Sequence, residues 1–452
     1  MKRDKEKRVY RQSPARILTL FFFTIITIGA FLLNTPFATV SGERIGLLNA
    51  YFTATSAVCV TGLIVVDTSA VFSLFGQIVV MLLIQCGGIG IMIFASIIYG
   101  FLRRKMSIAN MLVMREALNQ DNMATLTKTI TNVVKLTFFI EGIGAVLLAI
   151  RFIPEFGLVK GTFYSVFHSV SAFCNAGFDL MDGNFTSITA YMADPLIVLT
   201  ISGLIISGGI GFAVTHEVLH RKHNRKLSLQ ARVVFGTTAF LLVAGTLGIY
   251  ALERTNPLTL GDPNMSEGVR WLSAFFQSVT CRTAGFNTID QAGMRTGSKL
   301  LSMGLMFVGA SPASTGGGIK TTTFAIIVLA CIALIKQQKE ITFKYKRVSQ
   351  ETVMKAFVTA TVSLGILCLC TFVIACAEPN VGLVDIMYES FSAVATVGIT
   401  TGITSTLGNV SKIALILTMF AGRVGPITLT MAFAGEGKKK VIKNIEAGIM
   451  IG

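Results

Sequence analysis

Charged residues are scarce in this chain. Only 14% of its 452 residues are Asp, Glu, Lys or Arg, 52% are hydrophobic, and the mean hydropathy is +0.69. A water-soluble domain carries about 25% charged residues, because its surface must be solvated. The composition therefore excludes an ordinary soluble domain and predicts an integral membrane protein.

Patterns typical of cofactor sites are lacking too. The eight cysteines lie mostly in apolar surroundings without the spacing of metal ligands, so we interpret them as packing residues. The glycines at 316–318 suggest a phosphate loop, but Ile319 separates Gly318 from Lys320 and breaks the required G-K-[ST] pattern. We expect no organic cofactor in this chain.

Acidic residues are fewer than basic ones, 23 against 39, which gives a net charge of +16. This excess could indicate a nucleic-acid partner, but its distribution indicates membrane topology instead. The basic residues gather in five segments, with 7 in Met1–Arg16, 6 in Arg103–Lys135, 5 in Arg221–Arg232, 6 in Lys336–Lys355 and 4 in Lys438–Gly452. The positive-inside rule places all five in the cytoplasm. Both termini are therefore expected there, and no nucleic acid is needed.

The first apolar run begins at Ile17, directly after a basic segment. It lacks the small-residue cleavage site of a signal peptide, and further apolar runs follow it, so an uncleaved first span is expected. The chain is accordingly predicted to be a multi-pass protein of the cell membrane.

Four similar stretches recur along the chain, and each ends in a glycine. Their separations are 115, 108 and 113 residues, and ten residues before each glycine stands an aromatic residue. The glycines are Gly62, Gly177, Gly285 and Gly398, and the aromatic residues are Phe52, Phe167, Phe275 and Tyr388. Repetition at a fixed period indicates one structural unit that packs against its own copies.

A second glycine signature follows each of these stretches, in a long apolar segment. It reads Gly-Gly-Ile-Gly at 87–90 and 208–211, Gly-Gly-Gly-Ile at 316–319 and, more loosely, Gly-Arg-Val-Gly at 422–425. For these motifs we favour close helix packing, except in the third repeat.

Each repeat holds two apolar segments and, between them, a short segment such as Ile45–Val58 that cannot cross a bilayer, which requires about 20 residues. We therefore expect about eight spans and four short re-entrant helices. The expected boundaries are a cytoplasmic segment at 1–16, repeats at 17–103, 104–222, 223–338 and 339–437, and a cytoplasmic segment at 438–452.

The glycine stretches have the chemistry of an ion pathway. A helix that ends in mid-membrane directs its carbonyl end, with its partial negative charge, toward the centre. The loop after it offers backbone carbonyls in place of an ion's hydration shell, and glycine permits the backbone angles that this needs. Monovalent cations are the expected cargo. For a single glycine, close helix packing is the better interpretation, but four in matching positions favour the pathway.

These four loops, the Gly-Gly-Ile-Gly segments and the stretch 309–323 resemble the Ktr/Trk/HKT superfamily of potassium transporters, most closely its KtrB-type membrane subunits. The resemblance runs from about Pro14 to the C-terminus. It implies an all-α membrane protein with four membrane-pore-membrane repeats around one pore, and a homodimer with one pore in each subunit. It also implies potassium as the transported ion and a cytoplasmic nucleotide-binding RCK ring (KtrA-type) as partner, beside membrane lipid. The chain is then a transporter and not an enzyme.

The resemblance further implies a potassium filter centred on the four loop glycines. The filter residues are Val60, Thr61, Gly62, Asn175, Ala176, Gly177, Thr283, Ala284, Gly285, Thr396, Val397 and Gly398. Relatives with Ser at the first glycine favour sodium, so Gly62 indicates potassium. No loop carries the complete Thr-Val-Gly-Tyr-Gly of potassium channels. We therefore expect moderate selectivity, and sodium stays open as a second ion.

The third repeat contains a helix interruption between Gly309 and Lys320, where Pro312 and three consecutive glycines disfavour a continuous helix. The resemblance makes this segment a gate below the filter. The expected gate residues are Ser314, Thr315, Gly316, Gly317, Gly318, Lys320 and Arg423. Charges at membrane depth indicate function by default. Arg423 is expected to form an electrostatic barrier and to help hold this loop. The alternative is a structural pair with Glu141 or a backbone carbonyl.

Two other functions fit parts of the sequence. His216-Glu217-x-x-His220 matches the H-E-x-x-H motif of zinc proteases, but no third ligand is evident and the motif stands where a span meets a basic segment. A polar helix end explains it better. A carrier with alternating access could also use broken helices at the midplane. Four parallel repeats with cytoplasmic boundaries favour a pore with one axis instead.

Overall fold

The computed structural model describes residues 14–90, 123–181, 187–219, 227–338, 340–343, 346–425 and 428–429. Within these ranges the chain is almost entirely helical, and the same order of helices recurs four times. Each unit begins with a long helix, and the four long helices are α2 (Pro14–Leu33), α8 (Met123–Phe156), α12 (Leu229–Glu253) and α16 (Gln350–Ala377). All four are long and apolar enough to cross a membrane.

The second helix of each unit is short. These helices are α3 (Leu47–Cys59), α9 (Leu158–Cys174), α13 (Glu267–Thr280) and α17 (Leu383–Ala395). At 1.5 Å per residue, even the 17 residues of α9 span only about 26 Å, less than the hydrocarbon core. The C-terminal half of each is buried, apart from the half-buried Phe275 on α13 and Phe391 on α17. The expectation of short helices that enter the protein without crossing it agrees with these lengths.

The third helix of each unit ends near its glycine signature. It is α5 (Leu74–Ile89) in the first unit, α10 (Pro195–Ile210) followed by α11 (Phe212–Leu219) in the second, α14 (Thr296–Phe307) and α15 (Thr321–Ile335) in the third, and α18 (Asn409–Val424) in the fourth. α5, α10 and α18 are each followed by a glycine with positive φ, at Gly90, Gly211 and Gly425.

One expectation about these helices was wrong. From the sequence, the motif at 208–211 was interpreted as close helix packing, and a helix interruption was expected only in the third repeat. The structure breaks the second repeat as well, with a bend of 100° between α10 and α11. Gly211 makes this possible, because its φ of +97° is a conformation that other residues rarely adopt.

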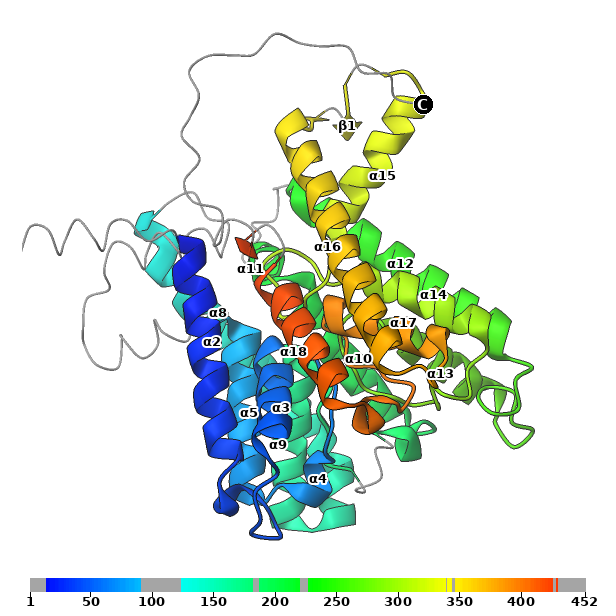
Figure 1. The fold of residues 1–452 in the computed structure, drawn as a ribbon. Coiled ribbons are helices and arrows are strands. Elements are labelled where there is room, and N and C mark those ends of the chain that lie inside the picture. Colours follow the sequence, from blue (N-terminus) through cyan, green and yellow to red (C-terminus); the bar gives the residue numbers. More distant parts are fainter. Residues whose placement is uncertain are drawn as a thin grey trace, which may run out of the picture.

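The remaining elements are small. They are α4 (Thr68–Val71), the 3₁₀ turns η1 (Pro36–Ala38), η2 (Thr189–Tyr191) and η3 (Thr404–Thr406), and an antiparallel pair, β1 (Thr342–Phe343) and β2 (Lys346–Arg347). This pair joins α15 to α16, and the two helices extend beyond the rest of the described chain at that end (Figure 1).

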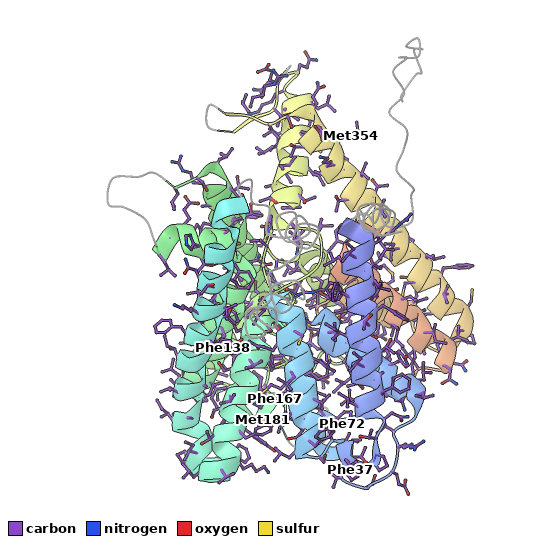
Figure 2. The ribbon with its side chains drawn as sticks, turned by 90° about the vertical axis from the view of Figure 1, so that its left-hand side faces the viewer. Phe37, Phe72, Phe138, Phe167, Met181 and Met354 are labelled. Carbon is purple, nitrogen blue, oxygen red and sulfur yellow. The ribbon has the colours of Figure 1, made fainter. Side chains whose placement is uncertain are left out.

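The units are arranged around a shared centre. In Figure 1 the helices of the first two units lie on one side and those of the last two on the other, with α10 and α18 between them. The outer helices present apolar side chains to the surroundings. Phe138 on α8 is 57% exposed, whereas Phe72 and Phe167 are fully buried inside (Figure 2). Exposed apolar side chains on long apolar helices fit a lipid environment. The predicted all-α membrane fold is therefore confirmed.

Candidate functional site

The four loop glycines meet at the centre of the protein and form a closed ring. A Cβ added at Gly62 would lie 2.5 Å from the carbonyl oxygen of Ala176, and one at Gly177 would lie 2.6 Å from that of Ala284. A Cβ added at Gly285 would lie 2.8 Å from the carbonyl oxygen of Val397. One added at Gly398 would lie 2.1 Å from that of Thr61, which closes the ring. Each glycine thus contacts the residue that precedes the next glycine. Contacts this close to backbone leave no space for a side chain.

The backbone of the four loops is strained in the same way. All four glycines have φ between +69° and +93°. The residues two positions earlier also have positive φ, and they are Val60 (56°), Asn175 (60°), Thr283 (68°) and Thr396 (50°). Positive φ is a genuine outlier for β-branched residues such as Val and Thr. The sequence contains no signal for this second position, because its four residues share no side-chain chemistry.

Hydroxyl groups on the short helices hold these loops. Ser56 and Ser392 stand six residues before their glycines and accept hydrogen bonds from the N–H of Gly62 (3.1 Å) and Gly398 (2.9 Å). Ser171 and Thr280 instead donate to the carbonyl of the residue after the glycine, Phe178 (2.6 Å) and Phe286 (2.7 Å). Ser56, Ser171 and Ser392, each six residues before its glycine, are therefore part of the loop structure.

A cavity of about 640 Å³ opens on one side of the ring and reaches all four glycines. Four aspartates line it, Asp67, Asp179, Asp262 and Asp290, and no Lys, Arg or His is found among its described lining residues. A concave surface with charge of one sign concentrates counter-ions, here cations.

Asp179 lies in this cavity, two residues after Gly177. Burial raises the pKa of its carboxyl group to about 7. The backbone N–H of Met181 donates to it and lowers the pKa, the charge of Asp67 raises the pKa, and a hydrogen bond with Ser187 lowers it. The carboxyl group is therefore hydrogen-bonded within its own loop, and it is subject to repulsion from the neighbouring aspartate.

The Gly309–Lys320 loop lies on the other face of the ring. A Cβ at Gly316 would lie 2.0 Å from Thr283 Oγ1, and one at Gly317 would lie 2.2 Å from Thr396 Oγ1. The loop folds back on itself, because the N–H of Gly309 donates to Ile319 O (3.0 Å). The expected interruption is thus a compact loop packed directly against two of the filter candidates.

The broken second helix supports the same loop. The N–H groups of Ser311 and Thr315 donate to the carbonyls of Gly209 (3.0 Å) and Gly208 (3.3 Å), and the N–H of Phe212 donates to Ala313 O (2.8 Å). The break at Gly211 exposes backbone groups that a continuous helix would use internally. The sequence interpretation missed this contact, which joins segments about 100 residues apart.

Three basic side chains donate to carbonyls of the Gly309–Lys320 loop. Lys320 Nζ lies 2.7 Å from Gly316 O, and Arg282 Nη2 lies 3.5 Å from Gly309 O. Arg423 bonds through Nη1 to Thr315 O and through Nη2 to Gly87 O. Lys320 and Arg423 thus both have backbone carbonyls of this loop as partners. The sequence interpretation assigned no role to Arg282.

Glu141 is not the partner of these cations. Both of its carboxyl oxygens accept from Gln85 Nε2, at 3.0 and 3.1 Å, and the side chain is 4% exposed. It ties α8 to α5 behind the second loop, which is a structural role.

The zinc-protease motif is only partly described. Glu217 accepts from the backbone N–H and the hydroxyl of Ser228, both at 2.6 Å, and so helps to start α12. His216 lies 3.4 Å from the side-chain nitrogen of Asn132, and His220 lies outside the described residues. In the part of the chain that the structure covers, no three His, Cys, Asp or Glu residues are grouped as metal ligands.

Comparisons with known proteins agree with this architecture. A family model described as cation transport protein, TrkH, matches residues 2–441. The chain is 39% identical to Ktr system potassium uptake protein B of Bacillus subtilis (96% of each chain) and 38% identical to the protein of that name from Vibrio alginolyticus (100% of this chain, 97% of the relative). It is 36% identical to the potassium/sodium uptake protein NtpJ of Enterococcus hirae (100% and 99%).

A solved structure shares the fold. The potassium transporter TrkH from Vibrio parahaemolyticus matches with a TM-score of 0.73 and 18% identity, covering 94% of this chain and 85% of that one.

Fold, ring and lipid-exposed helices together define an integral membrane transport protein. The chain belongs to the TrkH family of cation transport proteins, as the family model and the full-length relatives show. The resemblance noted from the loop motifs is thereby confirmed.

Proposed function

We propose that this chain takes up potassium through a channel-like pore and is the membrane subunit of a Ktr-type system. The observation that carries the proposal is the closed ring of Gly62, Gly177, Gly285 and Gly398, each packed against the carbonyl before the next. Relatives over 35% identical are named as potassium uptake proteins, and one as a potassium/sodium uptake protein. Potassium is the main ion, and sodium is a weaker competitor.

The ring acts as the filter in this proposal. Positive φ at the glycines and at the residues two positions before them turns successive carbonyls toward the axis, where they replace part of the hydration shell of the ion. The acidic cavity concentrates cations at its entrance. Because the loops lack the full potassium-channel signature, discrimination against sodium is moderate.

The Gly309–Lys320 loop acts as the gate. Its contacts with Thr283 and Thr396 support a position in the ion path directly below the filter. Arg423 binds the loop and places a positive charge there, which opposes the passage of cations. Opening then requires the loop to leave its bonds with α10 and Arg423.

The remaining assignments concern assembly and topology. The chain forms a homodimer, its repeats follow the boundaries 17–103, 104–222, 223–338 and 339–437, and both termini lie in the cytoplasm. A nucleotide-binding RCK ring docks on the basic cytoplasmic face. The name "Ktr system" of the relatives supports a further subunit, and the α15–α16 extension carries the exposed basic residues Lys336 and Arg347, the second paired with Glu340 (2.9 Å). The segments 103–122 and 438–452, also basic, lie outside the described residues.

Rubidium uptake into liposomes that hold the purified protein tests the proposal. We expect uptake driven by an ion gradient, with competition strongest for potassium, weaker for sodium and weakest for lithium. Liposomes without protein provide the background. Absence of uptake, or equal competition by all three ions, would overturn the assignment.

A further inference from the structure

A buried polar cluster joins the third and fourth repeats beside the ring. Gln277 on α13 and Gln291, six residues after Gly285, exchange two amide hydrogen bonds of 2.7 and 3.0 Å. The hydroxyl of Tyr388 on α17 donates to the same Gln291 Oε1 at 2.9 Å. The three side chains are 0%, 2% and 0% exposed. Three segments that surround the third and fourth loops are therefore tied at one point.

The amide groups of this cluster have further partners. Gln291 Nε2 also donates to Ile289 O at 2.9 Å, and Gln277 Nε2 lies 3.7 Å from Cys281 Sγ. A buried polar network with its groups satisfied specifies one geometry, because any shift leaves a donor or acceptor unpaired. The cluster thus resists sliding of α13 against α17.

The cluster differs from the ties in other repeats. Tyr388 is the only hydroxyl-bearing residue among the four aromatic residues that stand ten positions before a glycine. In the second repeat His168 accepts from Leu180 N–H (3.3 Å), and in the fourth Glu389 accepts from Thr404 (2.9 Å). Those two ties stay within one repeat, whereas the Gln277–Gln291–Tyr388 cluster connects two, as the Gln85–Glu141 bond connects the first and second repeats.

The cluster also lies close behind the loops themselves. Tyr388 packs in one apolar group with Cys281, Val397 and Ile399. The third and fourth loops are already in tight contact, because a Cβ at Gly285 would lie 2.8 Å from Val397 O. A change in the separation of α13 and α17 therefore changes the separation of these two loops.

We infer that Gln277, Gln291 and Tyr388 are positioning residues that fix the distance between the third and fourth loops and thereby set the discrimination between potassium and sodium. The inference rests on the proposed function, because it takes the ring as the filter. A ring held at one width cannot contract around the smaller sodium ion, and a loosened ring can. The cluster acts through the loops, and of its three side chains only Gln291 also lines the acidic cavity.

The test measures competition of potassium and sodium with rubidium uptake in liposomes. Tyr388→Phe removes one hydroxyl and keeps the ring, and we expect it to lower the potassium/sodium ratio roughly fivefold, the scale of one neutral hydrogen bond. Gln291→Met keeps the length of the side chain but removes all amide bonds, so its effect should be larger. In the double variant with Gln291→Met, Tyr388→Phe should lower the potassium/sodium ratio no further, because the hydroxyl acts through Gln291.

Two comparisons complete the experiment. Tyr191→Phe removes a phenol that donates to Glu155 (2.7 Å) away from the cluster, and it should leave the ratio unchanged. Gly398→Ser tests the filter itself. If Gly398→Ser lowers the ratio and Tyr388→Phe does not, the inference fails and the proposed function stands. If Gly398→Ser leaves the ratio unchanged, the proposed function fails. If Tyr388→Phe weakens the competition by potassium and by sodium equally, the variant has only lost structure and the inference is overturned. If Gln291→Met does not fold, Tyr388→Phe alone decides the test.

Discussion

Arg423 on α18 donates a hydrogen bond to the carbonyl of Thr315, 108 residues earlier in the chain. Its second nitrogen donates to Gly87 in the first repeat, so one guanidinium group joins three of the four repeats. A buried charge is tolerated at membrane depth when it is hydrogen-bonded in this way. The contact couples the Gly309–Lys320 loop to α5 and α18.

Replacing Arg423 with Gln should raise cation flux roughly tenfold. A unit charge about 10 Å from the ion contributes ~1.7 kcal/mol at an effective dielectric constant of 20, and the loop loses one anchor as well. Flux is measured as rubidium uptake at matched protein density. Lys412→Gln, a neutralisation on the same helix but at its other end, is the control and should change little. Unchanged flux in Arg423→Gln would show that the residue is structural only.

Gly398→Ser should lower the potassium/sodium ratio roughly tenfold, a change of ~1.4 kcal/mol in the free energy of discrimination. The new side chain meets Thr61 O, 2.1 Å from the added Cβ, at a residue with φ +93°. Gly402→Ala is a matched control, because Gly402 has φ +94° but nothing within 4 Å of an added Cβ. The two variants separate crowding of the ring from backbone strain, and equal selectivity in both would argue against the ring as the filter.

Deleting Ser314–Gly318 should raise flux and reduce its dependence on the cytoplasmic partner. The deletion removes the carbonyls of Thr315 and Gly316, which bind Arg423 and Lys320, and the contacts with Thr283 and Thr396. Ser314→Ala, which removes only the hydrogen bond to Ser311 O (2.6 Å), should leave flux nearly unchanged. Uptake is compared with and without the partner, and a shortened loop that still closes the pathway would contradict the gate assignment.

Gly208→Ala should destabilise the protein by about 1 to 3 kcal/mol, because the added Cβ would lie 1.9 Å from Phe173 O at the end of α9. Gly203 lies on the same helix with open space around it, so Gly203→Ala should stabilise by up to about 1 kcal/mol through helix propensity. Thermal unfolding in detergent measures both changes. Similar changes of the unfolding temperature in the two variants would show that the contact between Gly208 and α9 does not contribute to stability.

Much of this architecture could be predicted from local features. The glycine periods and their aromatic partners predicted the four loops, and the composition predicted the membrane. The glycines of the second signature, in the third helices, lie in close contacts. A Cβ at Gly87, Gly208 or Gly422 would lie about 2 Å from a carbonyl near the end of the adjoining short helix. The interpretation of these motifs as packing sites is consistent with these contacts, but it did not anticipate the break at Gly211.

The class of protein and the positions of the four glycines could be predicted from the chain alone, because composition and repetition are read directly from the order of the residues. The groups that the buried charges bind follow from the tertiary structure, since Arg423, Thr315 and Gly87 are brought together across 108 and 336 residues. The same holds for the positive φ of Val60 and Thr396, which the packed ring imposes against their own preference. Long-range packing, and not local propensity, determines the geometry of the ring.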